Sequence, residues 1–319
     1  MGCDNAADLD HAAPVTRRRF GMKVDLLLEG ERDVVADAVR TALMEDGHLI
    51  LTGDALQPIA DAMERWEAFT ALPLAQRQRY HQSVKVGEAS GGWMLMREHP
   101  VYTSHMSEAE RATTEPKQEY GFTVETERTL WPDHTLAPGF SASVKTVMAL
   151  LDAISRALLG AFEAVLGEAR GFLQYEPGYV ALKHYPGTTV SDDGLHEHSD
   201  AVVFTMLSQD RESLGIRGRD GAWITAPADP SGALVVIPGD WMELFTNGQI
   251  PAVRHRVRGT EQPRMSLAFF QGVAPMPVGP LTRFVEAGEE ARYPTVQSDI
   301  DYVGGESGVP RWQSHIGCC

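Results

Sequence analysis

The chain has 319 residues, of which 43% are hydrophobic and 23% charged, as in an ordinary globular protein of one or two domains. Its formal net charge of −16 argues against nucleic acid and membrane surfaces as partners, because binding to phosphates needs a basic face. The three cysteines, Cys3, Cys318 and Cys319, lie at the chain ends, so we expect a cytoplasmic protein without a disulfide framework. No stretch is apolar and long enough to cross a membrane, and we expect a monomer.

The N-terminal part predicts a tail followed by helices. Residues 1–22 lack an apolar core and read as a mobile tail, and the run 23–28 is compatible with a short strand. Apolar residues then recur at helical spacing between positions 34 and 42, and Gly47 ends that helix. Residues 48–51 are typical of a strand.

Two further helices are predicted before residue 175, where the sequence pattern changes from helical to strand-like. Residues 54–80 form an amphipathic pattern, 83–130 have no clean period, and 141–167 predict a long helix that ends at a glycine. From residue 175 onward, short apolar or alternating runs are separated by turn residues, which is typical of an antiparallel sandwich or barrel. The fold class predicted is α+β, with a jelly-roll core and flanking N-terminal helices.

The expected organisation is one folded domain with four parts. They are the tail 1–22, a helical region 23–172 packed on the core, a jelly-roll core 173–280 that carries the site, and a C-terminal tail 281–319 that could form a lid.

Polar chemistry gathers in the stretch "HEHSD", residues 196–200. On a strand, His196, His198 and Asp200 would point to one face. A polar strand end facing solvent would explain this row equally well. A later strand carries His255, which faces its apolar side and could be a hydrogen-bonded core histidine. Two histidines and a carboxylate on an all-β scaffold are, however, the ligand set that holds iron(II) and leaves positions open.

A second signal is Arg264, which shares a strand face with Ser266 in an otherwise apolar run. A buried arginine needs an anion, because an unpaired buried charge is very costly. Arginine can grip a carboxylate with two donors, and a nearby hydroxyl adds a third. The anion could be an internal carboxylate, but a dicarboxylate co-substrate fits this context better.

These residues resemble the iron(II)/2-oxoglutarate-dependent dioxygenase superfamily, in its isopenicillin N synthase-like and plant-type branch. The family pattern H-x-D…H…R-x-S occurs here as His198-Ser199-Asp200, His255 and Arg264-Met265-Ser266. The resemblance extends over residues 23–275 and is most specific between 180 and 270.

The resemblance implies the cofactors Fe(II), 2-oxoglutarate and O2. His198, Asp200 and His255 would bind the metal, and His196 would flank it. Arg264 and Ser266 would hold the distal carboxylate of 2-oxoglutarate, assisted by Tyr185. Lys183 stands where the family often has an asparagine, so it could contact the oxo acid or the substrate, or be a surface lysine.

The implied reaction is oxidation of an unactivated C–H bond of a small, specialised-metabolite substrate, by hydroxylation, desaturation or ring formation, with release of succinate and CO2. The segment 90–106 is expected to close over the substrate. Candidate substrate contacts are Met94, Met96, Arg97, Tyr102, His196, Phe204 and Phe270, although ordinary packing would explain each of them. The alternatives are an iron oxidase of the same fold that does not use 2-oxoglutarate, and a zinc-binding jelly roll without redox activity.

Overall fold

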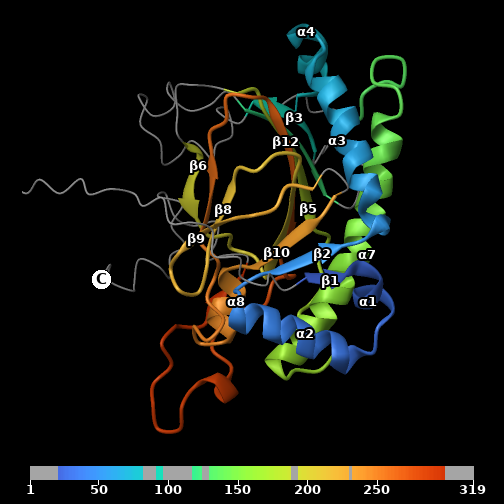
Figure 1. Ribbon diagram of the computed structural model, residues 1–319. Helices are drawn as coiled ribbons and strands as arrows, with labels where there is room; N and C mark the ends of the chain where they lie inside the picture. The colour runs from blue at the N-terminus through green and yellow to red at the C-terminus, as the bar shows by residue number, and fades with distance from the viewer. Residues whose placement is uncertain are drawn as a thin grey trace, which may run out of the picture.

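The computed structural model describes residues 21–81, 91–95, 117–123, 129–187, 193–229 and 232–298. Within these ranges two β-sheets form the centre of the molecule, and helices cover one outer face of it (Figure 1). No helix of these ranges combines the length and apolar character that crossing a membrane requires.

The larger sheet contains eight strands among the described residues. They are β1 (Gly21–Lys23), β2 (Leu49–Thr52), β3 (Gly92–Leu95), β4 (Gln118–Thr123), β5 (Tyr179–Tyr185), β7 (Phe204–Gln209), β10 (Leu234–Pro238) and β12 (Arg264–Gln271). Their order across the sheet is β1-β2-β10-β7-β12-β5-β4-β3, and all neighbours except the β1–β2 pair are antiparallel.

The smaller sheet has the order β6-β11-β8-β9. Its strands are β6 (Asp193–His198), β8 (Leu214–Arg217), β9 (Trp223–Thr225) and β11 (His255–Arg258), and a separate pair is formed by β13 (Pro277–Val278) and β14 (Val296–Gln297). Apolar side chains of both sheets form one buried cluster, which contains Tyr185, Leu214, Ile216, Ala226, Val235, Ile237, Val253 and Val257. This two-sheet arrangement agrees with the predicted α+β fold with a jelly-roll core.

Strand alternation separates a pocket face of the larger sheet from a core face. On β12, Arg264, Ser266 and Phe270 line a pocket between the sheets, whereas Leu267 and Phe269 belong to the core under the helices. The site therefore depends on the register of a few strands.

The core face is covered by helices. They are α1 (Val24–Glu29), α2 (Arg32–Glu45), α3 (Gln57–Thr70) and α7 (Phe140–Leu166). The described residues also form α4 (Leu74–Arg77), which buries no residue, α8 (Asp240–Phe245), which contacts β10 and β13, and 3-10 turns at Asp54–Leu56, Gln78–Tyr80 and Thr282–Phe284. Both α2 and α3 pack against α7, and α3 also contacts β5 and β12. Buried aromatic rings of Trp66, Phe69, Tyr120 and Phe140 interlock where α3, α7 and β4 meet. The long helix ends at Gly167, as predicted, where a φ of 74° suits glycine.

Three elements differ from the sequence prediction. Most of the run 23–28 is helical as α1, because Val24 and Leu27 are three residues apart and both bury their side chains on one helical face. Residues 240–245, which lie among strand-like runs, form α8. The N-terminal half is not only helical: β1 to β4 extend the larger sheet at both edges. The strand predicted at 48–51 is β2, whereas β1, β3 and β4 were not predicted, because their segments show no clean strand pattern.

Candidate active site

Two histidines and one aspartate meet at the end of the smaller sheet. His198 is the last residue of β6 and pairs in register with His255, the first residue of β11. Their ring centroids are 4.2 Å apart. The Nε2 atoms of His198 and His255 each lie 3.6 Å from an oxygen of Asp200. One ligand atom from each residue falls within 4.8 Å of the others, so the three can share one metal ion.

The sequence pattern suggested that Asp200 shares a strand face with His198, but the structure does not place it on the strand. It lies two residues beyond β6, in a turn, where its backbone carbonyl accepts hydrogen bonds from the amides of Val202 (3.0 Å) and Asp240 (2.8 Å). A Cβ on Gly239 would approach the carbonyl oxygens of Asp200 to 2.6 Å and Val202 to 2.3 Å. Glycine is therefore required at 239 for this turn to hold Asp200 beside the histidines.

Hydrogen bonds prepare these side chains for a cation. The Thr205 hydroxyl donates to Asp200 Oδ2 over 2.6 Å. His255 Nδ1 lies 3.1 Å from the Val253 carbonyl, which can only accept, so Nδ1 donates this hydrogen bond and Nε2 is the ring nitrogen that faces the site. Burial would raise the pKa of Asp200, but His255, His198 and the Thr205 hydroxyl together lower it, which keeps the carboxylate ionised.

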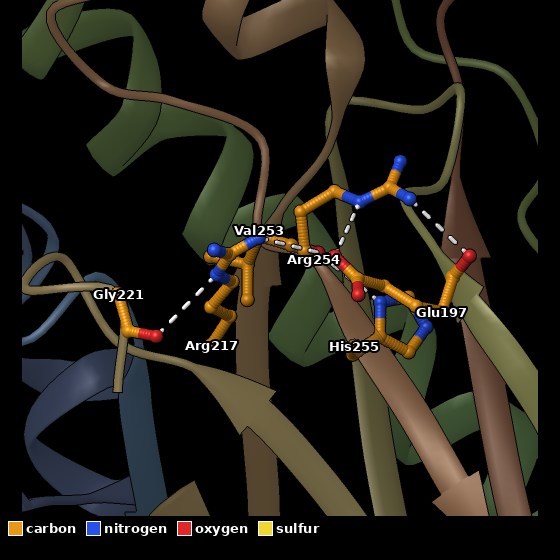
Figure 2. A network of polar contacts seen from close by, with 6 residues as sticks. All are labelled: Glu197, Arg217, Gly221, Val253, Arg254 and His255. Atoms are coloured by element: carbon orange, nitrogen blue, oxygen red, sulfur yellow. Dashed lines mark hydrogen bonds and ion pairs between the residues drawn. The ribbon is translucent and has the colours of Figure 1, made fainter. Parts of the chain in front are cut away.

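An ion-pair network on the opposite side ties together the strands that carry the histidines (Figure 2). Glu197 of β6 accepts from Arg254 Nε (3.1 Å) and Arg217 Nη1 (3.4 Å), and its carbonyl accepts from Arg254 Nη2 (3.2 Å). Since Glu197 and Arg254 adjoin His198 and His255, these contacts support the pairing of the two candidate ligands.

The anion candidate Arg264 lies in the same pocket and is 1% exposed. Its Cζ stacks 3.4 Å from the centroid of the Tyr185 ring, and the two residues are register partners on β12 and β5. Neither Nε nor Nη2 of Arg264 has a hydrogen-bond partner among the described residues. An internal carboxylate therefore does not occupy this fork, which suits a bound carboxylate. Ser266 and Lys183, the next inward-facing register pair, line the same pocket.

Lys183 is not a surface lysine. Its side chain is 14% exposed, and its Nζ lies 3.9 Å from Oε2 of the buried Glu119. Burial would lower the pKa of Lys183, but the charges of Glu119, Tyr185 and Asp200 raise it overall, so the side chain is an ammonium. The pocket thus combines two cations with the three candidate metal ligands.

The expected substrate contacts are only partly brought together. Phe270 lines the pocket. Phe204 does not: it is fully buried on the core face, 5.1 Å from Phe162 of α7 between ring centroids, so that prediction is wrong. Met94 is buried on β3 as register partner of Glu119, outside the pocket lining. Met96, Arg97 and Tyr102, and most of 90–106, lie outside the described residues, as does the side chain of His196.

Sequence reasoning missed two residues that support the site. Thr205, which holds Asp200, is a polar residue inside an apolar strand, and that contrast was a usable signal. Glu119, which pairs with Lys183, comes from a segment without a clean period, so no local pattern pointed to it.

The donor set fits iron(II) and a dicarboxylate. Two imidazoles and one ionised carboxylate suit a borderline divalent ion such as iron(II), and zinc accepts the same donors. A metal ion alone would not explain why Nε and Nη2 of Arg264 are buried without a hydrogen-bond partner among the described residues, whereas a bound carboxylate would.

Comparison with known proteins agrees with this chemistry. Residues 175–273 match the family model described as the 2OG-Fe(II) oxygenase superfamily. Gibberellin 3-beta-dioxygenase 2 of Arabidopsis thaliana is 31% identical over 181 residues, which make up 53% of this chain and 52% of that protein. Jasmonate-induced oxygenase 3 of the same plant is 26% identical over 300 residues, or 92% of this chain and 81% of that protein. The chain therefore matches about half the length of the first relative and about four fifths of the second.

Solved structures share the fold. A full-length Neurospora crassa protein, solved in complex with alpha-KG, has a TM-score of 0.70 at 21% identity, over 87% of this chain and 92% of that one. JOX2 in complex with 2OG, Fe and JA has a TM-score of 0.71 at 21% identity, over 93% of this chain and 87% of that one. The similarity spans the helices as well as the sheets.

Proposed function

This chain belongs to the 2OG-Fe(II) oxygenase superfamily, and on that premise we propose that it is an iron(II)- and 2-oxoglutarate-dependent oxygenase acting on a small molecule. One observation carries the proposal: the cluster of His198, Asp200 and His255 shares a pocket with a buried Arg264 whose Nε and Nη2 lack partners among the described residues. The metal cluster alone would fit zinc, and the arginine alone would fit many anions. Together they match a metal and a dicarboxylate bound side by side.

The roles of the residues follow from their chemistry. His198, Asp200 and His255 would hold iron(II), and Thr205 keeps Asp200 oriented and ionised. When bound, iron(II) and 2-oxoglutarate supply with O2 the oxidising power for C–H cleavage, and succinate and CO2 leave as products.

The remaining pocket residues position the oxo acid and keep it dry. Arg264 would grip the distal carboxylate of 2-oxoglutarate, with Ser266 and Tyr185 as further donors. Leu195, Leu207 and Phe270 present apolar surface to the same pocket, which limits the access of water to the reacting groups.

For the substrate, we propose a small metabolite of specialised metabolism, changed by hydroxylation, desaturation or ring formation by a monomeric enzyme. Support comes from the fold relatives, since the Neurospora crassa protein has been solved with thymine and JOX2 with JA. The net charge of −16 further disfavours nucleic acid as a substrate.

The test combines binding and turnover. Calorimetric titration of 2-oxoglutarate into the Mn(II)-loaded protein should give one site per chain, and the iron(II) enzyme in air should release succinate when a substrate from a metabolite library is added. Substrate oxidation without 2-oxoglutarate binding would favour the iron oxidase of the same fold. Tight zinc retention together with no 2-oxoglutarate binding would favour a zinc site and refute the proposal.

A further inference from the structure

The ammonium of Lys183 lines the pocket with hydrogen-bond donors that no described side chain uses. An ammonium offers three hydrogen-bond donors, yet Lys183 Nζ forms no hydrogen bond with any residue that the structure describes. Its charge partner Glu119 is 3.9 Å away, beyond hydrogen-bond distance, and Glu119 Oε1 accepts a hydrogen bond from the Tyr179 hydroxyl over 2.9 Å. The ion pair therefore orients the lysine without satisfying it.

On the strand pair β5–β12 the charged groups of Lys183 and Arg264 lie against different aromatic rings. The Arg264 guanidinium stacks on its register partner Tyr185, at one end. Lys183 Nζ lies 5.6 Å from the centroid of the Phe270 ring, toward the other end, where Phe270 pairs with Tyr179. The distal carboxylate that Arg264 would hold thus lies toward the Tyr185 end, away from the donors of Lys183.

The Lys183 end is the metal end of the pocket. Thr205 is the register partner of Phe270 on β7 and donates to Asp200. Lys183 also lines the pocket together with His198, Asp200 and His255. A molecule whose carbon is to be oxidised must approach this same end, because the metal is held there.

We propose that Lys183 binds a carboxylate of the substrate, so that the substrate class is small carboxylic acids. The inference rests on the proposed function, since it concerns the same pocket. Glu119 and Tyr179 are positioning residues, which hold the ammonium at the Phe270 end. We expect the pocket to bind a carboxylate more tightly than a neutral analogue, because the Lys183 ammonium is largely shielded from water and a neutral group cannot balance its charge.

The test uses the Mn(II)- and 2-oxoglutarate-loaded protein, which binds substrate without turnover. Phenylacetate, indole-3-acetate and trans-cinnamate are each titrated beside their primary amides, with tryptophan fluorescence and calorimetry as readouts. We expect at least one acid to bind about 10- to 150-fold more tightly than its amide, the range for a hydrogen bond to a charged group. Lys183→Met should remove this preference and Lys183→Arg should keep it, while Lys145→Met on α7 should change nothing.

Three results would overturn the inference. The first is that acid and amide bind equally, or that neither binds, in all three pairs. The second is a preference for the acid that survives in Lys183→Met. The third is a loss of 2-oxoglutarate affinity in Lys183→Met as large as in Arg264→Met, which would assign Lys183 to the oxo acid. A wild-type protein that fails to bind 2-oxoglutarate would refute the proposed function instead, so the two failures are distinct.

Discussion

At the scale of single residues, the carboxylate of Asp200 depends on the hydroxyl of Thr205. That hydroxyl is fully buried and donates over 2.6 Å to the oxygen nearest His255. Such partners orient metal ligands and tune their basicity, and their loss typically weakens metal binding about 10- to 100-fold.

We therefore expect Thr205→Val to bind Mn(II) about 10- to 100-fold more weakly than wild type, with its fold intact. Calorimetric titration of the metal measures this. Thr129→Val is the matched control, because the buried Thr129 hydroxyl has no partner among the described residues and lies outside the pocket. Equal metal affinity in wild type and Thr205→Val would show that Asp200 is held by its backbone alone.

We expect Arg264→Met to weaken the binding of 2-oxoglutarate without lowering the stability of the ligand-free protein. Losing a buried, charge-paired donor costs about 2–5 kcal/mol, which weakens 2-oxoglutarate by roughly thirty- to several-thousand-fold. The ligand-free variant should nevertheless be at least as stable as wild type, because two buried guanidinium nitrogens without partners are removed. Chemical denaturation and calorimetry measure the two effects, and the exposed Arg258→Met serves as control. A strongly destabilised ligand-free variant would mean that Arg264 is structural.

At the scale of elements, a polar chain behind the pocket joins α4, β3, β4 and β5. Gln118 Oε1 accepts hydrogen bonds from Arg77 Nη1 and Trp93 Nε1, so the Gln118 amide nitrogen must donate to His184 Nδ1 over 2.9 Å. His184 is therefore neutral there. Burial, Arg77 and Arg264 lower the pKa of His184 to about 4 from 6.5.

This predicts a pH-dependent loss of stability. Between pH 6.5 and about 4 the unfolded chain takes up a proton at His184 and the folded chain does not, so stability falls as the pH falls through this window. His184→Gln should lose less stability than wild type over the same range, as measured by urea denaturation at several pH values. His134→Gln, at an exposed turn, should follow wild type. Parallel curves for wild type and His184→Gln would contradict the assignment of a neutral buried histidine.

For the Glu197 ion-pair network we predict only a small contribution to the free energy of unfolding. Its ion pairs are substantially exposed, and such pairs contribute about 0–1 kcal/mol each. Glu197→Gln should therefore lower the free energy of unfolding by less than about 1 kcal/mol, and high salt should abolish the difference. Metal affinity should fall less than in Thr205→Val. A larger loss of metal affinity would show that the outer network, and not the strand register, sets the distance between His198 and His255.

At the scale of the whole molecule, the site bridges elements that only folding brings together. Its metal cluster comes from β6, the turn after it and β11, and its anion end comes from β12 and β5. Ligands bound there should stabilise the native state, because the unfolded chain presents no such site.

Mn(II) and 2-oxoglutarate together should accordingly raise the melting temperature. At a concentration one hundred times the dissociation constant, each independent ligand adds about 2.7 kcal/mol of stability. Differential scanning calorimetry checks this, and a chelator should reverse it. His255→Ala should show little stabilisation by the metal, whereas equal stabilisation of that variant and wild type would place the metal elsewhere.

The sequence by itself determined the local elements and the chemical types of the site. Helical spacing predicted α2, α3 and α7, and short alternating or apolar runs predicted the strands from β5 to β12, because neighbouring residues carry those signals. His198, Asp200, His255 and Arg264 were recognisable because polar residues stand out in apolar strands. Only the tertiary structure decided which of these side chains meet. Strand partners far apart in sequence set the register that pairs His198 with His255 and leaves Phe204 in the core, and they bring Glu119 to Lys183.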